Sequence, residues 1–138
     1  MRFMIIRKAD AQTEAGALPT AALMDAMVRY MEEMGNAGIL RGGDGLQPSA
    51  KGARVRFSGG RPTVIDGPFT ETKELVAGYH IIDVPTMQDA IAWTRKWPTL
   101  DGDGGVELEI RPLIEAEDFG EAFTEDMRRA RAHLERLQ

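Results

Sequence analysis

The residues best suited to acid–base chemistry are concentrated in one stretch of the chain, residues 66–74. Its sequence is Asp-Gly-Pro-Phe-Thr-Glu-Thr-Lys-Glu, so three carboxylates and one ammonium group lie within nine residues. Gly67 and Pro68 are expected to end a strand and redirect the chain, because glycine adopts φ angles that other residues avoid and proline donates no backbone hydrogen bond. We call this stretch the signature loop.

A hairpin is expected directly before the signature loop. Residues 54–58 and 61–66 flank Gly59-Gly60, a pair favoured in two-residue hairpin turns. With that turn, Phe57 pairs with Pro62 and Val55 pairs with Val64. Side chains alternate along a strand, so one face of the hairpin should carry Val55, Phe57, Val64 and Asp66.

Asp66 therefore stands at the end of an apolar face, and two interpretations of it are compatible. As a turn residue, its carboxylate accepts backbone hydrogen bonds around residues 67–69. As a partly desolvated carboxylate, it serves as a general acid or base. We expect Asp66 to be partly buried and close to Lys73 or to the loop around Glu14, because a buried carboxylate needs hydrogen bonds or a cation.

The other charged residues of the signature loop also allow two interpretations, an exposed surface or a functional site. Glu71, Lys73 and Glu74 form either a salt-linked surface or a site in which Lys73 polarises a substrate carbonyl or pairs with a substrate carboxylate while Glu71 transfers protons. The candidate substrate-binding residues are Glu14, Pro68, Phe69 and Glu74.

His80 is a further catalytic candidate. It lies in the middle of an apolar strand, where a histidine is either a hydrogen-bonded core residue or a catalytic group.

Composition narrows the classes of function. The 138 residues fit one domain, and the net charge of −5 argues against nucleic acid as a main partner, because phosphate binding needs a concentrated basic surface. The absence of cysteine excludes disulfides, thiolate nucleophiles and cysteine-ligated metals. Two isolated histidines and the lack of a dinucleotide or phosphate-binding motif predict neither a metal nor a cofactor.

No apolar run approaches the ~20 residues that span a bilayer, so no membrane partner is expected. The apolar run near the N-terminus has only four residues, too few for a signal peptide. The expected location is the cytoplasm.

Hydrophobic periodicity predicts the order β-α-β-β-β-α-β-α. Strands are expected at residues 2–8, 54–58, 61–66, 75–84 and 106–112, and helices at residues 20–34, 86–97 and 124–137. Thr20 and Thr86 are the expected N-caps of the first two helices. Residues 10–19 and 42–52 are expected to be loops. We assign residues 1–120 to one α+β domain and residues 121–138 to a C-terminal amphipathic helix that extends it.

Strand Leu75–Val84 is apolar on both faces. Such a strand requires cover on both sides. Helices supply one cover, and a second copy of the sheet is the natural source of the other. The sequence therefore predicts a homodimer.

Several segments together resemble the DGPF branch of the YCII-related proteins. They are strand Arg2–Lys8, Glu14-Ala-Gly, residues 49–60, the signature loop and residues 107–112. The resemblance implies a ferredoxin-like split β-α-β sandwich that pairs as a dimeric α+β barrel. Distant relatives carry a proposed catalytic His–Asp pair nearer the N-terminus, but the histidines here are His80 and His133, so that pair is not carried over.

Two functions follow from the resemblance and the signature loop. In the first, a cleft at the loop binds a small organic substrate and performs cofactor-free acid–base chemistry. In the second, the protein is a non-enzymatic sensor or adaptor, because DGPF-type proteins are associated with extracytoplasmic-function sigma factors, which implies a sigma-factor system as partner. Convergent acid–base groups around a pocket favour the first function, and a flat exposed apolar patch favours the second.

Overall fold

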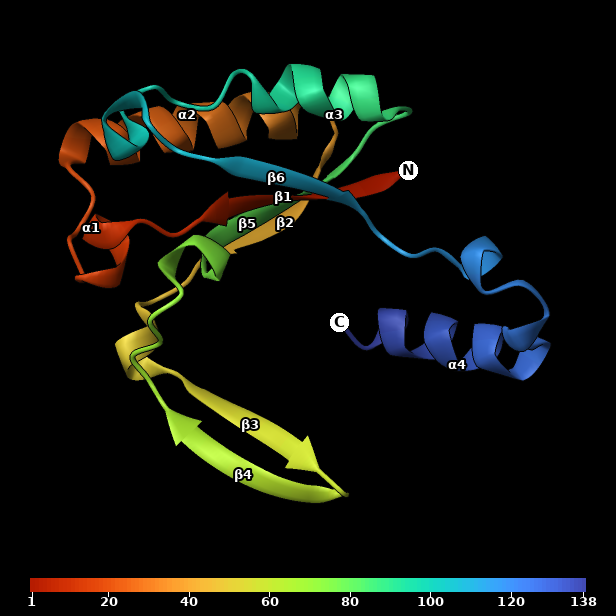
Figure 1. Ribbon diagram of the computed structural model, residues 1–138. Coiled ribbons are helices and arrows are strands. Elements are labelled where there is room, and N and C mark those ends of the chain that lie inside the picture. The colour runs from red at the N-terminus through yellow and green to blue at the C-terminus, as the bar shows by residue number, and fades with distance from the viewer.

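Four antiparallel strands form the main sheet of the protein (Figure 1), for which a computed structural model describes residues 1–138. The strands are β1 (Arg2–Lys8), β2 (Leu40–Gly45), β5 (Val76–Asp83) and β6 (Leu108–Pro112), in the order β2-β5-β1-β6. Helix α2 (Ala21–Asn36) connects β1 to β2, and helix α3 (Met87–Thr94) connects β5 to β6. The segments β1-α2-β2 and β5-α3-β6 are thus both split β-α-β units, each with a strand of the other between its own two strands. The expected α+β class with an antiparallel sheet is confirmed.

Local sequence explains why the two helices begin where they do. The Thr20 hydroxyl accepts a hydrogen bond from the backbone of Leu23 at 3.1 Å and caps α2. Thr86 and Asp89 form a reciprocal capping box at the start of α3. Both N-caps were expected from the sequence.

The hydrophobic core lies between the main sheet and these two helices. Alternate residues of β1 and β5 point toward the helices and are buried, whereas their neighbours are only partly covered. The core consists of Phe3, Ile5, Ile82 and Val84 from the sheet region, with Tyr30, Met34, Ala90 and Trp97 packed on them.

A buried ion pair ties β1 to the turn before β6. Arg7 is 6% exposed, and its guanidinium donates to the Asp101 carboxylate at 3.1 and 2.7 Å. Asp10 also pairs with Arg7, and the Trp97 indole donates to Asp101. Burial raises the pKa of Asp101, but the hydrogen bonds from Arg7 and Trp97 outweigh it, so the pKa lies below its usual value. Sequence periodicity gave no sign of this pair.

The strand β2 corrects the prediction of a loop at residues 42–52. Its sequence, Leu-Arg-Gly-Gly-Asp-Gly, has no β-branched residue and low strand propensity. It is a strand because it pairs with β5, with Gly43 opposite His80. The predicted loop at residues 10–19 likewise contains a short helix, α1 (Ala11–Glu14), which Asp10 caps.

The hairpin formed by β3 (Ala53–Ser58) and β4 (Arg61–Asp66) is separate from the main sheet. Its expected register is confirmed, with Val55 opposite Val64 and Phe57 opposite Pro62. Gly59 and Gly60 both have positive φ, as a tight turn of this type requires.

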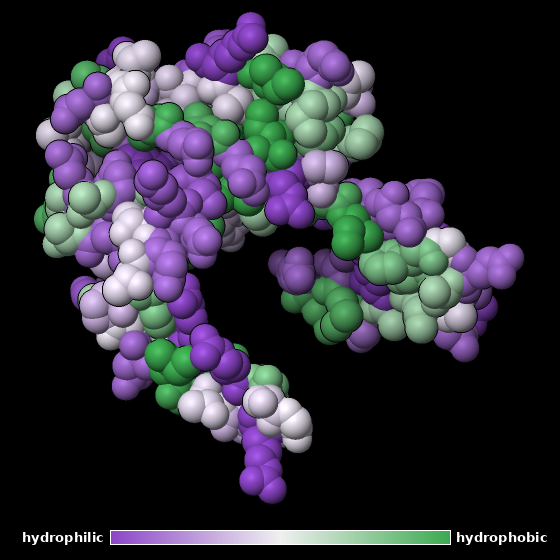
Figure 2. Space-filling model, in the orientation of Figure 1, coloured by the Kyte–Doolittle hydropathy of each residue, from purple (hydrophilic) through white to green (hydrophobic).

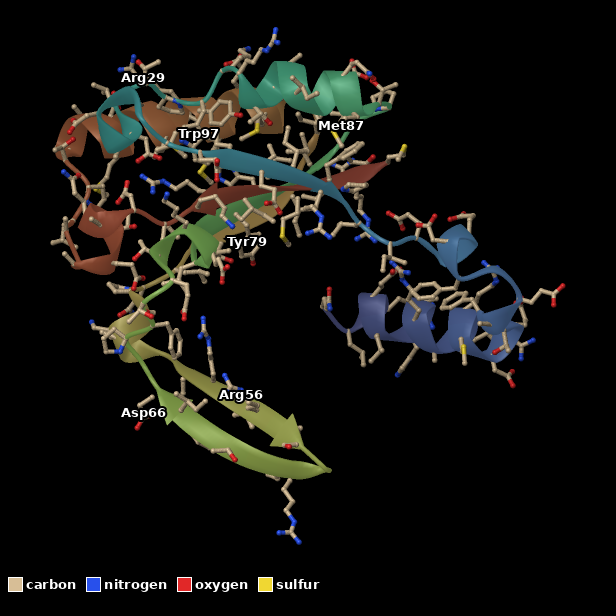
Figure 3. All side chains as sticks on the ribbon, in the orientation of Figure 1. Arg29, Arg56, Asp66, Tyr79, Met87 and Trp97 are labelled. Atoms are coloured by element: carbon tan, nitrogen blue, oxygen red, sulfur yellow. The ribbon has the colours of Figure 1, made fainter.

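The face of the main sheet opposite α2 and α3 has no cover. Its centre is apolar, with Met4, Ile6, Tyr79 and Ile81 all half-buried. The hairpin and the C-terminal helix α4 (Glu125–Arg136) both lie on this side in Figure 1. Tyr79, one of the residues of this face, is labelled in Figure 3. The structure contains one chain, so the predicted homodimer stays a prediction.

The close approach of β2 to β5 leads to a first prediction, the cost of a side chain at Gly43. A Cβ there would lie 2.4 Å from His80 Cδ2 and 2.7 Å from the Tyr79 carbonyl oxygen. We expect Gly43→Ala to lower the free energy of unfolding by about 1–3 kcal/mol, the usual cost of overpacking. A Cβ at Gly42 meets nothing within 4 Å, so Gly42→Ala is the matched control. Equal stability of the two variants in urea unfolding would show that β2 does not pack as described.

Candidate functional site

The signature loop is held against the segment that contains the short helix Ser49–Lys51. The Gly67 backbone NH donates to the Gly52 carbonyl at 3.0 Å. A Cβ at Gly67 would lie only 1.7 Å from the Ser49 carbonyl oxygen. Gly67 does not have a positive φ, so our sequence-based reason for this glycine was wrong. Glycine is needed because another backbone passes too close for any side chain.

A chain of hydrogen bonds fixes the loop from a second direction. The Glu14 carboxylate accepts from the Ser49 backbone NH at 3.0 Å and from the Ser49 hydroxyl at 2.5 Å. The Ser49 hydroxyl in turn accepts from the Phe69 backbone NH at 3.0 Å. Glu14 thus reaches the signature loop through Ser49. Its observed contacts anchor the loop, and the role of Ser49 in this anchor could not be inferred from the residue pattern.

Arg54 and Phe69 form a half-buried contact in this region. The Arg54 guanidinium carbon lies 3.8 Å from the centre of the Phe69 ring, a cation–π geometry. Its Nη1 atom is 3.6 Å from a Glu71 carboxylate oxygen. That distance is beyond a normal hydrogen bond, so the guanidinium retains donors for another acceptor. Periodicity had placed Arg54 in the hairpin without assigning it to the site.

Glu71 is ionised at neutral pH. A backbone hydrogen bond is the main cause that lowers the pKa of Glu71, and the Thr70 hydroxyl at 3.3 Å and the charge of Arg54 lower it further. A carboxylate with a low pKa is unsuited to act as a general acid and is a weak general base at neutral pH. Lys73 and Glu74, in the single turn Thr72–Glu74, are exposed and form no ion pair.

Asp66 does not lie where we expected. It is exposed, and Figure 3 shows its side chain pointing outward at the base of the hairpin. The expectation that it is partly buried beside Lys73 or Glu14 was wrong. The apolar face on which it lies is itself uncovered, since Val55 and Val64 are 56% and 65% exposed. Strand alternation placed Asp66 on the correct face, but this chain supplies nothing to bury that face.

His80 lies in the core, away from solvent. It is 6% exposed and lies between Tyr30 and Trp97, whose ring centres are 6.2 and 5.3 Å from the imidazole. Burial lowers the pKa of His80, so the ring is neutral at pH 7. Its Nδ1 atom has no hydrogen-bond partner. The structure therefore confirms a core position but not the hydrogen bond that we expected there.

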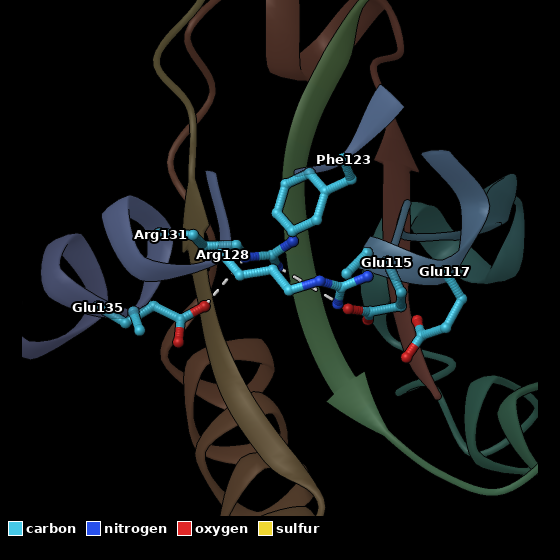
Figure 4. Close-up of a pocket in the computed structure, with 8 residues that line it drawn as sticks. Glu115, Glu117, Phe123, Arg128, Arg131 and Glu135 are labelled. Carbon is cyan, nitrogen blue, oxygen red and sulfur yellow. Dashed lines mark hydrogen bonds and ion pairs between the residues drawn. The ribbon is translucent and has the colours of Figure 1, made fainter. Parts of the chain in front are cut away.

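A shallow groove lies between α4 and the segment before it (Figure 4). Arg131 pairs with Glu135 at 3.1 Å and approaches Glu115 at 3.8 Å, while Arg128 lies over the Phe123 ring. Glu115 also accepts from Arg2 of β1 at 2.9 Å. These charged groups already pair with one another, so we interpret their contacts as an anchor for the C-terminal segment.

The described residues contain no group of three histidine, cysteine, aspartate or glutamate side chains placed to hold a metal ion. No helix is both long enough and apolar enough to cross a membrane.

Comparison with known proteins identifies the family. The model of the YCII-related domain matches residues 1–114, so the chain belongs to the YCII-related family. An uncharacterized protein of Rhizobium meliloti is 37% identical over 68 residues, which is 49% of this chain and 54% of that protein. The chain thus spans about half the length of this curated relative.

The fold was also compared with solved structures. The 5-chloro-2-hydroxyhydroquinone dehydrochlorinase of Burkholderia phenoliruptrix AC1100, solved in complex with 2,5-dihydroxybenzoquinone, superposes with a TM-score of 0.48 at 13% identity. The superposition covers 83% of this chain and 95% of that one.

The packing of Gly67 leads to a prediction about the signature loop. We expect Gly67→Ala to displace the loop from Ser49, because the added Cβ would overlap a backbone oxygen. The Phe69 amide should then lose its protection from hydrogen exchange, whereas amides of β1 and β5 should keep theirs. In Gly52→Ala, the matched control, the added Cβ is 3.5 Å from the same oxygen, an ordinary contact. Unchanged exchange at Phe69 in Gly67→Ala would contradict the close approach.

Proposed function

We propose that this YCII-related protein binds a small organic anion at its signature loop, with Arg54 and Phe69 as the main contacts. The observation that carries the proposal is the Arg54 guanidinium, held 3.8 Å above the Phe69 ring on a loop that Glu14 and Ser49 fix in place. A guanidinium offers planar, charged donors that match a carboxylate, and an aromatic ring offers an apolar surface. A planar organic acid satisfies both.

Acid–base chemistry on such a ligand would use the exposed groups of the same loop. Glu71 is ionised and, although its lowered pKa makes it a weak base, it is the carboxylate available to accept a proton, and Lys73 is the cation that can polarise a carbonyl. Asp66 points outward and is a turn residue in this proposal. His80 is enclosed in the core and takes no part. The reaction proposed is therefore cofactor-free proton transfer on a bound small acid.

Benzoate is the simplest probe for this site, because it combines a carboxylate with an aromatic ring. We expect titration with benzoate to shift the amide NMR signals of residues 67–74, and expect the uncharged analogue benzamide to shift them less. Arg54→Ala should weaken benzoate binding about tenfold or more, since a hydrogen bond between charged groups contributes roughly 1.5–3 kcal/mol. Arg56→Ala, on the same strand, is the control. Shifts confined to other regions, or equal affinities of the two variants, would refute the proposed site.

We also infer that the uncovered face of the main sheet is the contact surface of a homodimer. Its centre is apolar, and its edge strands carry Asp44, Glu109 and Arg111. An apolar centre with a charged rim is the usual composition of a protein interface. An uncovered apolar face of this extent would otherwise promote aggregation. This arrangement would correspond to the dimeric α+β barrel that the resemblance implies.

Light scattering tests the homodimer directly. We expect a mass of twice the 15.2 kDa of one chain, and expect Ile81→Asp to shift the protein toward monomer or aggregate, because it places a charge in the centre of the apolar face. Ala92→Asp, on the exposed side of α3, should leave the mass unchanged. A wild-type mass of 15.2 kDa at micromolar concentration would refute the dimer.

The exposed apolar side chains of the hairpin favour a second candidate function, a non-enzymatic adaptor such as one in a sigma-factor system. Phe57 is 68% exposed on a face that this chain leaves uncovered. An adaptor of this kind would leave its NMR spectrum unchanged in benzoate. The titration that tests the ligand site therefore also separates the two functions.

A further inference from the structure

Two segments of the chain extend from the body without packing on it: the β3–β4 hairpin and helix α4. Neither packs against the main sheet or against α2 and α3 (Figure 1). An isolated two-stranded hairpin is marginally stable in water, and so is an isolated helix of fewer than ~12–15 residues. Helix α4 has 12 residues. Each segment therefore needs a covering surface to hold its structure.

Both segments expose an apolar face. The apolar face of the hairpin, which we call the hairpin face, consists of Val55, Phe57, Pro62 and Val64, and Phe57 is 68% exposed. On α4 and its C-cap, the spacing of Met127, Ala130, Leu134 and Leu137 forms a stripe, the tail stripe, and Leu134 is 58% exposed. The tail stripe is separate from the groove residues Arg128, Arg131 and Glu135, which face the rest of the C-terminal segment.

We propose that the hairpin face of one copy of the protein packs on the tail stripe of a second copy. The two surfaces match in length, because strands of six residues extend ~20 Å and a helix of 12 residues ~18 Å. Within one chain they are attached to opposite ends of the main sheet, since β4 leads into the start of β5 and β6 ends opposite Phe3. A second copy brings them together.

Charge favours the same pairing and sets its direction. The hairpin carries Arg54, Arg56 and Arg61 against one acid, Asp66 at its base. Residues 115–126 contain six carboxylates and no basic residue, whereas the rest of α4 carries four arginines. The three arginines lie on the side of the hairpin away from the hairpin face, so they attract the acidic segment through their field rather than by direct pairing, whereas Asp66 lies on the hairpin face itself. The attraction is greatest when the tip, with Arg56 and Arg61, lies at the start of α4 and Asp66 lies near its arginine-rich end. Phe57, near the tip, then contacts Met127 rather than Leu137.

This inference goes beyond the ligand site and needs no contact between the sheet faces of the two copies. It identifies the tail stripe of a second copy as the surface that covers the exposed hairpin. The second copy's α4 would then also lie along the strand that leads into the signature loop.

Cross-linking tests the pairing directly, because the chain has no cysteine of its own. Two full-length chains are co-expressed, one with Phe57→Cys and the other, carrying a size tag, with Met127→Cys. Each chain then has one thiol, so any product of a short thiol cross-linker joins two copies. We expect a mixed product on the order of tenfold more abundant than with the control cysteines, because docking raises the local thiol concentration to the millimolar range.

Three matched variants serve as controls. Arg56→Cys replaces Phe57→Cys on the opposite face of the hairpin, and Arg129→Cys replaces Met127→Cys off the tail stripe. Leu137→Cys tests direction, because ten residues of helix separate it from Met127 by ~15 Å. None of these residues belongs to the core, so unchanged melting curves are expected throughout.

The outcomes are distinct. A dominant link between Phe57→Cys and Met127→Cys supports the proposal. Equal yields from the control pairs, a dominant Phe57→Cys link to itself, or a dominant Leu137→Cys link would overturn it. As a second measurement, Arg61→Glu should reduce the mixed product and Glu125→Arg in the other chain should restore it. Failure of that rescue would overturn the proposed direction.

Discussion

The arrangement of the molecule depends on one packing constraint: its two central strands are apolar on both faces. Helices α2 and α3 cover one face of β1 and β5, and Phe3, Ile5 and Ile82 are buried beneath them. Two helices cannot also cover the second face, where Met4, Tyr79 and Ile81 remain partly exposed. Every element outside the main sheet that extends from the body lies on that second side (Figure 1), and Figure 2 shows the hollow between the extended segments. The fold is thus a half-covered sheet.

The signature loop is a rigid element in this setting because backbone contacts hold it. Gly67 lies against the Ser49 carbonyl, and the Ser49 hydroxyl joins Glu14 to the Phe69 backbone. The polar groups that the sequence marks as candidates have different roles as a result. Glu14 fixes the loop and Asp66 faces outward on the hairpin, while Arg54, which the sequence did not mark, forms a half-buried contact with Phe69. A preorganised loop favours binding, since little conformational entropy remains to be lost.

The two extended segments, like the open face of the sheet, carry apolar side chains that nothing in this chain covers. Each is short, each carries apolar side chains without cover, and neither is stabilised by the core. Association of two copies would remove both exposures at once. On this view the signature loop, at the base of the hairpin, lies next to the contact between copies, so binding of a ligand and association would be linked.

The sequence by itself determined the elements whose signals are local. Helix caps at Thr20 and Thr86, the strand β1 and the register of the hairpin were all predicted, because capping, periodicity and turn chemistry act over a few neighbouring residues. Only the tertiary structure decided the rest. The strand β2 exists because β5 pairs with it. Arg7 is buried with its charge paired because the fold brings it to Asp101, 94 positions away along the chain. Gly67 is required because Ser49 passes beside it. Asp66 shows the same limit, since alternation fixes the face of a strand, whereas burial of that face depends on whatever packs against it.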